Sequence, residues 1–126
     1  MKLTQSQRDT IVQTGLEFVG KRRLGVSCDG FVRKIFSMAD IDLSFESCPT
    51  FFRAEIFGEK AVGYPIFLRR KASEKGKRIT HMGIIFPNER VLHYSRWMRG
   101  TPEFYEVCLS TFEEVFAIYD FVEPVR

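Results

Sequence analysis

Three side chains in this sequence could perform nucleophilic chemistry together. They are Cys28 and the chain's two histidines, His81 and His93. A cysteine attacks a carbonyl carbon as its thiolate, so it needs a base that accepts the thiol proton. Imidazole is the side chain whose ordinary pKa lies closest to neutrality. Because the chain contains no further histidine, His81 and His93 are the candidate base and the group that orients it.

Cys28 stands where a loop is expected to meet the start of a helix. The loop, Lys21 to Ser27, is rich in Gly and basic residues, and the segment after it places apolar side chains on one helical stripe. That stripe comprises Phe31, Val32, Ile35, Phe36 and Ala39. A second helix is therefore expected to begin at or near Cys28.

A thiol at the N-terminus of a helix has two advantages for catalysis. The unpaired backbone N–H groups and the helix dipole favour negative charge, which lowers the thiol pKa from its reference value of about 8.5. The same N–H groups can hold the oxyanion of a tetrahedral intermediate. We therefore expect Cys28 to have a lowered pKa and to lie beside an oxyanion site.

The two histidines fall in neighbouring predicted strands. Ile79 to Phe86 and Val91 to Trp97 are short and rich in β-branched and aromatic residues, and a turn at residues 87–89 separates them. They are expected to form a hairpin, in which the register decides whether the imidazoles share a face.

Two registers of this hairpin bring the imidazoles together. In one, Ile85 pairs with Glu89 and the histidines lie directly opposite each other. In the other, Phe86 pairs with Arg90 and the histidines are diagonal neighbours, still close enough to hydrogen-bond. In either register one imidazole can orient and polarise the other.

The chain is expected to open with an amphipathic helix over Thr4 to Val19. Thr4 and Gln7 have the spacing of a capping box, and Gly20 is the expected stop. The predicted apolar face consists of Ile11, Val12, Leu16 and Val19. A short third helix is predicted over Thr50 to Phe57.

The later part of the chain is predicted to add further strands. They are Tyr64 to Arg69, Phe104 to Leu109 and Ala117 to Val122. Ser110 with Glu113 is expected to cap one brief helical turn before the last of them. Helices first and an antiparallel sheet second make an α+β fold, and 126 residues fit one domain of this kind.

Four segments follow one another in an order and at separations typical of one known family. They are Gly25-Val26-Ser27-Cys28-Asp29-Gly30-Phe31-Val32, Gly63-Tyr64-Pro65-Ile66-Phe67-Leu68, His81-Met82-Gly83-Ile84-Ile85 and Val91-Leu92-His93-Tyr94-Ser95. The first resembles the nucleophile motif, usually Asp-Cys-Ser-Gly-Phe-Val, of the NlpC family of bacterial papain-like cell-wall peptidases. The others are similar to successive strands of that family, and the resemblance extends from Phe18 to Trp97.

The resemblance implies a fold, a reaction and a set of residue roles. The implied fold is the papain-like, NlpC-type α+β fold. Cys28 is the implied nucleophile, His81 the general base and then general acid, and His93 the residue that orients His81. The implied reaction transfers an acyl group to water through a thioester, on a stem or crosslink peptide of peptidoglycan. No cofactor is implied, and we propose no metal ligand.

Positions near the nucleophile depart from the family pattern. Ser27 stands where the family has Asp, with an acid displaced to Asp29, and Arg23 stands where the family often has an oxyanion-binding Tyr. Arg23 could donate hydrogen bonds to an oxyanion, pair with Asp29 or bind a substrate carboxylate.

Some aromatic and basic residues have both a functional and a structural interpretation. Tyr94 and Trp97, with Arg96, could line a substrate groove beside His93, although such aromatic residues more often serve packing. The segment Arg69 to Arg78 holds six basic residues and one acid, and we interpret it as a solvated connection between strands. It lacks the interleaved aromatic residues that would stack on bases, so no specific nucleic-acid partner is expected.

The three cysteines of the chain are an odd and sparse set, which argues against a disulfide framework. Cys48 and Cys108 lie among apolar residues and are interpreted as packing residues. A zinc site formed by Cys28, His81 and His93 is chemically admissible, but no short-range ligand pair supports it.

The sequence shows no signal peptide and no apolar run long enough to span a membrane. We therefore expect a cytoplasmic protein, or one exported by a specialised phage or secretion-system route, and we expect a monomer. Two other functions remain open. One is a papain-like binding or assembly module that has lost catalysis, and the other is an acyltransferase or deamidase acting on a cytoplasmic protein.

Overall fold

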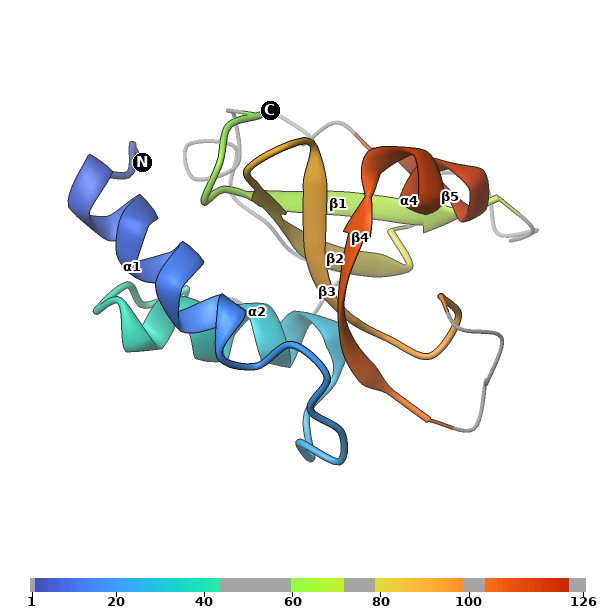
Figure 1. The fold of residues 1–126 in the computed structure, drawn as a ribbon, viewed down its shortest axis with the longest axis horizontal. Coiled ribbons are helices and arrows are strands. Elements are labelled where there is room, and N and C mark those ends of the chain that lie inside the picture. Colours follow the sequence, from blue (N-terminus) through green and yellow to red (C-terminus); the bar gives the residue numbers. More distant parts are fainter. Residues whose placement is uncertain (1, 44–59, 72–78, 99–103, 123–126) are drawn as a thin grey trace.

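The computed structural model describes residues 2–43, 60–71, 79–98 and 104–122. Two N-terminal helices pack on a five-stranded antiparallel sheet, as in papain-like folds (Figure 1). The predicted α+β class is therefore confirmed. The predicted helix over residues 50–57, Cys48 and most of the basic segment of residues 69–78 lie outside the described residues.

The first helix, α1 (Gln5–Leu16), begins with the predicted capping box of Thr4 and Gln7. It ends three residues earlier than predicted, and the predicted apolar face is wrong at Leu16 and Val19, which are 45% and 41% exposed. The buried side of α1 passes instead through Gly15. A Cβ atom there would lie 2.6 Å from the Leu92 side chain, so the helix approaches the sheet closely at this point.

The second helix, α2 (Cys28–Met38), confirms both predictions made for it. It begins at Cys28, and the hydroxyl of Ser27 caps it by accepting a hydrogen bond from the backbone N–H of Gly30. All five residues of the predicted stripe are buried. Because this stripe packs on the sheet, the position of the helix start, and with it Cys28, is determined by the core.

The sheet has the strand order β4-β3-β2-β1-β5, and every neighbouring pair is antiparallel. The strands are β1 (Pro65–Arg70), β2 (His81–Phe86), β3 (Arg90–Ser95), β4 (Glu106–Thr111) and β5 (Tyr119–Phe121). Each overlaps a predicted strand. The order places the histidine-bearing strands β2 and β3 at the centre of the sheet.

The helix α4 (Phe112–Ile118) links β4 to β5, and its predicted cap is wrong by one residue. Thr111 and Glu114 form the capping box, in place of Ser110 and Glu113. Ser110 therefore remains in β4, where its side chain is buried. Seven residues of helix form where one brief turn was predicted.

The two faces of the sheet are covered by different helices. On one face α1 and α2 lie together, and their apolar side chains join Phe67, Met82, Ile84 and Leu92 in one core cluster (Figure 1). On the other face α4 packs on the remaining apolar side chains, namely Ile66, Leu68, Ile85 and Val91. Within the described ranges, no helix has both the length and the apolar character needed to span a bilayer.

Candidate active site

The β2–β3 hairpin adopts the diagonal register of the two considered. Phe86 pairs with Arg90 and Ile84 with Leu92, which places His81 and His93 on the same face of the sheet as diagonal neighbours, two residues away from direct opposition. Nε2 of His81 lies 2.7 Å from Nδ1 of His93. The predicted contact between the two imidazoles is therefore present.

A third residue, Ser110 of β4, extends this contact into a chain across three strands. Its Oγ lies 3.0 Å from Nε2 of His93. His81 is 4% exposed, His93 is fully buried, and Ser110 is 4% exposed. Sequence reasoning missed Ser110 because its spacing to Glu113 resembled a helix cap. The signal that could have found it is its place two residues after Cys108, which puts both side chains on the same face of one strand.

The hydrogen bonds of this chain decide which ring nitrogen can act as a base. If Ser110 Oγ accepts from Nε2–H of His93, then Nδ1 of His93 accepts from Nε2–H of His81. Nδ1 of His81 is then unprotonated and able to take a proton. If Ser110 instead donates to Nε2 of His93, every hydrogen bond in the chain reverses and Nδ1 of His81 carries a proton. His81 can therefore accept a proton from Cys28 only when Ser110 is the acceptor.

Cys28 contacts β2 beyond the point where the pairing of β2 with β3 ends. The paired residues of β2 and β3 end at Ile84 and Leu92, whereas β3 and β4 stay paired as far as Ser95 and Glu106. The backbone N–H of Met82 belongs to the edge of β2 that faces β3, and it donates to the Cys28 thiol instead. The nucleophile candidate thus lies against the residue that follows His81.

The ionisation of Cys28 contradicts the prediction of a lowered pKa. Burial raises the pKa of the Cys28 thiol, and the negative charge of Asp29 raises it further. Backbone N–H groups of Met82, Asp29 and Cys28 itself act in the opposite direction but are outweighed. The helix start supplies the expected donors, but the tertiary packing around the thiol has the larger effect.

The two imidazoles are neutral at physiological pH. Burial is the main reason why the pKa of His81 lies well below its usual value, and the neighbouring His93 lowers it further. Burial also lowers the pKa of His93, to about 4. The described residues place no hydrogen bond between Cys28 and either imidazole. The resting site therefore contains a neutral thiol and a neutral base, without a thiolate–imidazolium pair.

Tyr119, the first residue of β5, covers the ring of His81. The two rings stack with their centroids 4.8 Å apart and their planes at 19°. The Tyr119 ring is buried, and its hydroxyl accepts a hydrogen bond from Ser95. Tyr119 therefore holds His81 in a fixed plane and excludes water from one side of it. Nothing in the sequence near Tyr119 distinguished it from a packing residue.

Ser27, Asp29 and Arg23 do not form the arrangement considered from the sequence. Ser27 donates a hydrogen bond of 2.7 Å to Asp29, in addition to capping α2. Asp29 is buried and forms an ion pair of 3.4 Å with Arg33. Arg23 is exposed and forms no ion pair with a described residue, so of the three possibilities considered for Arg23 the pair with Asp29 is not formed.

Tyr94 lies on the opposite face of β3 from His93, so the prediction that it lines a groove beside His93 is wrong. Adjacent residues of a strand point to opposite faces. Tyr94 is buried against α2, where its ring lies 5.9 Å from that of Phe31, and its hydroxyl accepts a hydrogen bond from the backbone N–H of Leu24. Its role is to anchor the loop that precedes Cys28.

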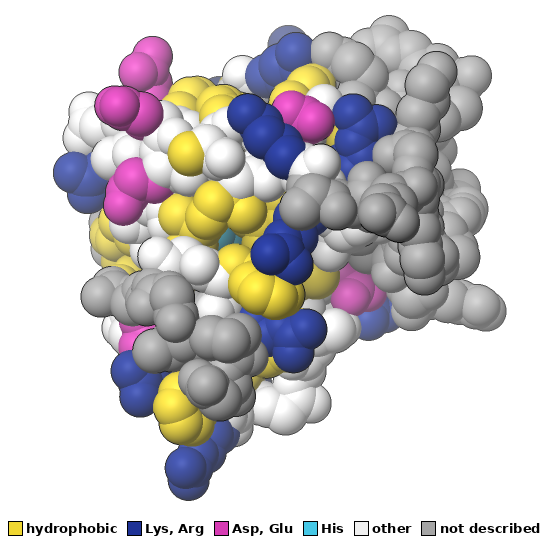
Figure 2. Space-filling view, turned by 90° about the vertical axis from the view of Figure 1, so that its right-hand side faces the viewer, with side chains coloured by type: hydrophobic (Ala, Val, Ile, Leu, Met, Phe, Trp, Pro, Cys, Tyr) yellow, Lys and Arg dark blue, Asp and Glu magenta, His cyan; other side chains and the backbone are white. Residues whose placement is uncertain are grey.

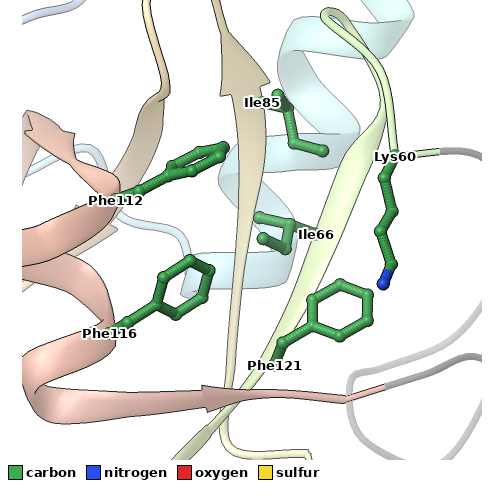
Figure 3. Close-up of a pocket in the computed structure, with 6 residues that line it drawn as sticks. All are labelled: Lys60, Ile66, Ile85, Phe112, Phe116 and Phe121. Atoms are coloured by element: carbon green, nitrogen blue, oxygen red, sulfur yellow. The ribbon is translucent and has the colours of Figure 1, made fainter.

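Two cavities lie on the face of the sheet that carries the histidines. The larger, of about 300 Å³, is apolar and lies between the sheet and α4 (Figure 3). Its lining residues are Lys60, Ile66, Ile85, Phe112, Phe116 and Phe121. The smaller, of about 180 Å³, borders Ser110 and Glu114. None of the three candidate catalytic residues lines either cavity.

Cys108 is buried, as predicted for a packing residue. Among the described residues, which include Cys28 and both histidines, no group of three or more His, Cys, Asp or Glu side chains is placed to hold a metal ion. Two helices packed on a five-stranded antiparallel sheet are the arrangement found in papain-like folds, and here a cysteine lies at the start of a core helix. The sequence matches no protein-family model, and no curated protein matches it.

Proposed function

We propose that this protein is a cysteine-nucleophile amide hydrolase with Cys28 as nucleophile, His81 as base and His93 as the residue that orients the base. The observation that carries the proposal is the 2.7 Å contact between His81 Nε2 and His93 Nδ1, beside a thiol at a helix start. A base whose far nitrogen is held by a second buried group is the arrangement that nucleophilic catalysis requires.

The ionisation of the site supports attack with concerted proton transfer. Because thiol and imidazole are both neutral at rest, Nδ1 of His81 removes the proton as Sγ of Cys28 bonds to the carbonyl carbon. The backbone N–H groups around the thiol stabilise the oxyanion. His81 then gives the proton to the leaving amine as the C–N bond breaks. Water, deprotonated by the same imidazole, hydrolyses the thioester and restores the thiol.

The resemblance to the NlpC family supports a peptide of peptidoglycan as substrate. It rests on the motifs around Cys28, His81 and His93 and on their order along the chain. The proposed reaction is therefore hydrolysis of an amide bond in a peptidoglycan stem or crosslink, with no cofactor.

The test is incubation of the wild-type protein with peptidoglycan stem peptides, followed by mass spectrometry of the products. We expect a new fragment that Cys28→Ala abolishes and that His81→Ala reduces by roughly 10²- to 10⁴-fold. Circular dichroism of each variant serves as the control for folding. Turnover that survives Cys28→Ala in a folded protein would refute the proposal.

The raised pKa of Cys28 favours a second candidate, a binding or assembly module that has lost catalysis. This candidate predicts that the thiol is alkylated no faster than a model cysteine at any pH. Fast alkylation that His81→Ala slows would count against it. An acyltransferase or deamidase would use the same triad, and mass spectrometry in the presence of added amines separates it from a hydrolase by the mass of the product.

A further inference from the structure

Arg70, at the end of β1, lies on the same face of the sheet as the histidines. Leu68 of β1 pairs with His81, and Arg70 is two residues further along the strand, directly opposite Tyr119 of β5. Tyr119 in turn stacks on His81. The side chain of Arg70 therefore projects from the sheet beside the proposed base.

The guanidinium of Arg70 crosses the site to reach Trp97. It lies 3.6 Å from the centre of the Trp97 ring, and Arg96 lies 5.0 Å from the same ring. Trp97 follows β3, while Arg70 ends β1, and β2 runs between these strands. The contact thus spans the start of β2, where His81 lies.

Arg70 and Arg96 differ from the described arginines that are paired with carboxylates. Arg22, Arg33 and Arg69 each form an ion pair with a carboxylate, of Glu106, Asp29 and Asp120 respectively. Arg70 and Arg96 rest on aromatic rings and have no ion pair within the described ranges. A guanidinium stacked by its face keeps the N–H donors of its edge available for a planar anion.

Tyr119 lies close to both Arg70 and the nucleophile candidate. Burial raises the pKa of the Tyr119 hydroxyl, the positive charge of Arg70 lowers it and Cys28 raises it, so both groups are near this side chain. Figure 2 shows a small area of histidine surface at the centre of one face, with hydrophobic and Lys or Arg side chains around it. A ligand that reaches the histidine therefore passes basic side chains.

We propose that Arg70, Arg96 and Trp97 form a subsite that binds a carboxylate of the substrate next to the amide bond that Cys28 attacks. This inference rests on the proposed function, because it names the substrate class of that site. Trp97 supplies a flat apolar surface, and the two guanidinium groups supply charge and paired donors. The preferred substrate is an amide whose neighbouring unit carries a free carboxylate.

The binding test uses Trp97 as its own reporter, because it is the only tryptophan of the chain. Titration with glutarate is expected to change the tryptophan fluorescence saturably, and titration with glutaramide is not. Arg70→Gln is expected to weaken glutarate binding by roughly five- to tenfold, the effect of losing one nearby charge. Arg69→Gln, which removes the neighbouring ion-paired arginine, is the matched control and leaves binding unchanged.

A second measurement connects the subsite to the nucleophile without requiring turnover. The rates at which iodoacetate and iodoacetamide alkylate Cys28 give a ratio, which is compared with that of the unfolded protein. The folded protein is expected to favour the anionic reagent by roughly five- to tenfold, an advantage that Arg70→Gln removes and that salt reduces.

Two results would overturn the inference. One is a fluorescence response that is equal for glutarate and glutaramide, and the other is a glutarate response that Arg70→Gln leaves intact. Neither result depends on catalysis, so both are distinct from a failure to cleave peptidoglycan peptides. If the protein cleaves such peptides but does not bind glutarate, the hydrolase proposal stands and the subsite is rejected.

Discussion

The two faces of the sheet take alternate residues from the same strands but differ in chemistry. Facing α1 and α2, the strands present apolar side chains such as Met82, Ile84 and Leu92 to one continuous core. Facing α4, the neighbouring positions include His81, His93 and Ser110, with a cavity of about 300 Å³ among the apolar residues nearby. One face thus stabilises the fold, and the other holds groups that could react.

This comparison teaches how a small domain can bury a reactive site. Burial of an imidazole disfavours its charged form, and the protein accommodates this cost by hydrogen-bonding each buried polar side chain. Within the described residues, every buried side-chain nitrogen or oxygen has a hydrogen-bond partner. The buried polar groups on the histidine face therefore all have hydrogen-bond partners, which offsets the cost of removing them from water.

The largest expected effect contrasts neighbouring isoleucines on the two faces. Ile84 is fully buried in the core under α1 and α2, whereas Ile85 borders the larger cavity. We expect Ile84→Ala to lower the free energy of unfolding by about 2–5 kcal/mol, and Ile85→Ala by less, because its surroundings are already incompletely packed. Urea denaturation at pH 7 measures both. Equal losses would show that the two faces contribute equally to stability.

The next effect is a loss of stability in acid that originates on the polar face. In the unfolded chain His93 has the ordinary imidazole pKa of about 6.5, whereas burial lowers its pKa to about 4 in the folded protein. Between about pH 6.5 and pH 4 the unfolded state therefore binds more protons than the folded state, and lowering the pH favours unfolding. The contribution of His93, about 3 kcal/mol, is complete above pH 6.5 and is lost as the pH falls to about 4. Denaturation at a series of pH values measures this, and His93→Gln is expected to flatten the decline. A free energy of unfolding that stays constant from pH 6.5 to pH 4 would contradict it.

The smallest effect concerns Ser110, which joins the histidines to β4. Ser110→Ala leaves Nε2 of His93 without its partner, at an expected cost of about 1–3 kcal/mol in the free energy of unfolding. Because the hydroxyl also sets the polarity of the histidine chain, kcat should fall further than stability alone explains, and its pH profile should shift. Ser110→Thr keeps the hydroxyl and is the control. An unchanged pH profile in Ser110→Ala would limit Ser110 to a structural role.

Local patterns predicted the elements and part of the site. The loop rich in Gly and basic residues, followed by the apolar stripe from Phe31 to Ala39, predicted that α2 begins at or near Cys28. The short turn between β2 and β3 predicted the hairpin and two registers in which His81 and His93 share a face, and the structure adopts one of these two. These features depend on residues close together in the chain.

Features that depend on distant segments could not be predicted in this way. The exposure of Leu16 follows from the close approach of Gly15 to the sheet, and the place of Tyr94 follows from which face α2 covers. The stack of Tyr119 on His81 joins residues 38 positions apart. None of these contacts has a signature within a short window of sequence.

The sequence by itself determined the order of the described helices and strands, the cap at Thr4, and which residues were chemically able to form a nucleophilic site. Side-chain periodicity and capping chemistry act over a few residues, so they are present in the chain before it folds. Only the tertiary structure decided the protonation of the site. Burial raises the pKa of Cys28 and lowers that of His81, because desolvation depends on every segment packed around these groups.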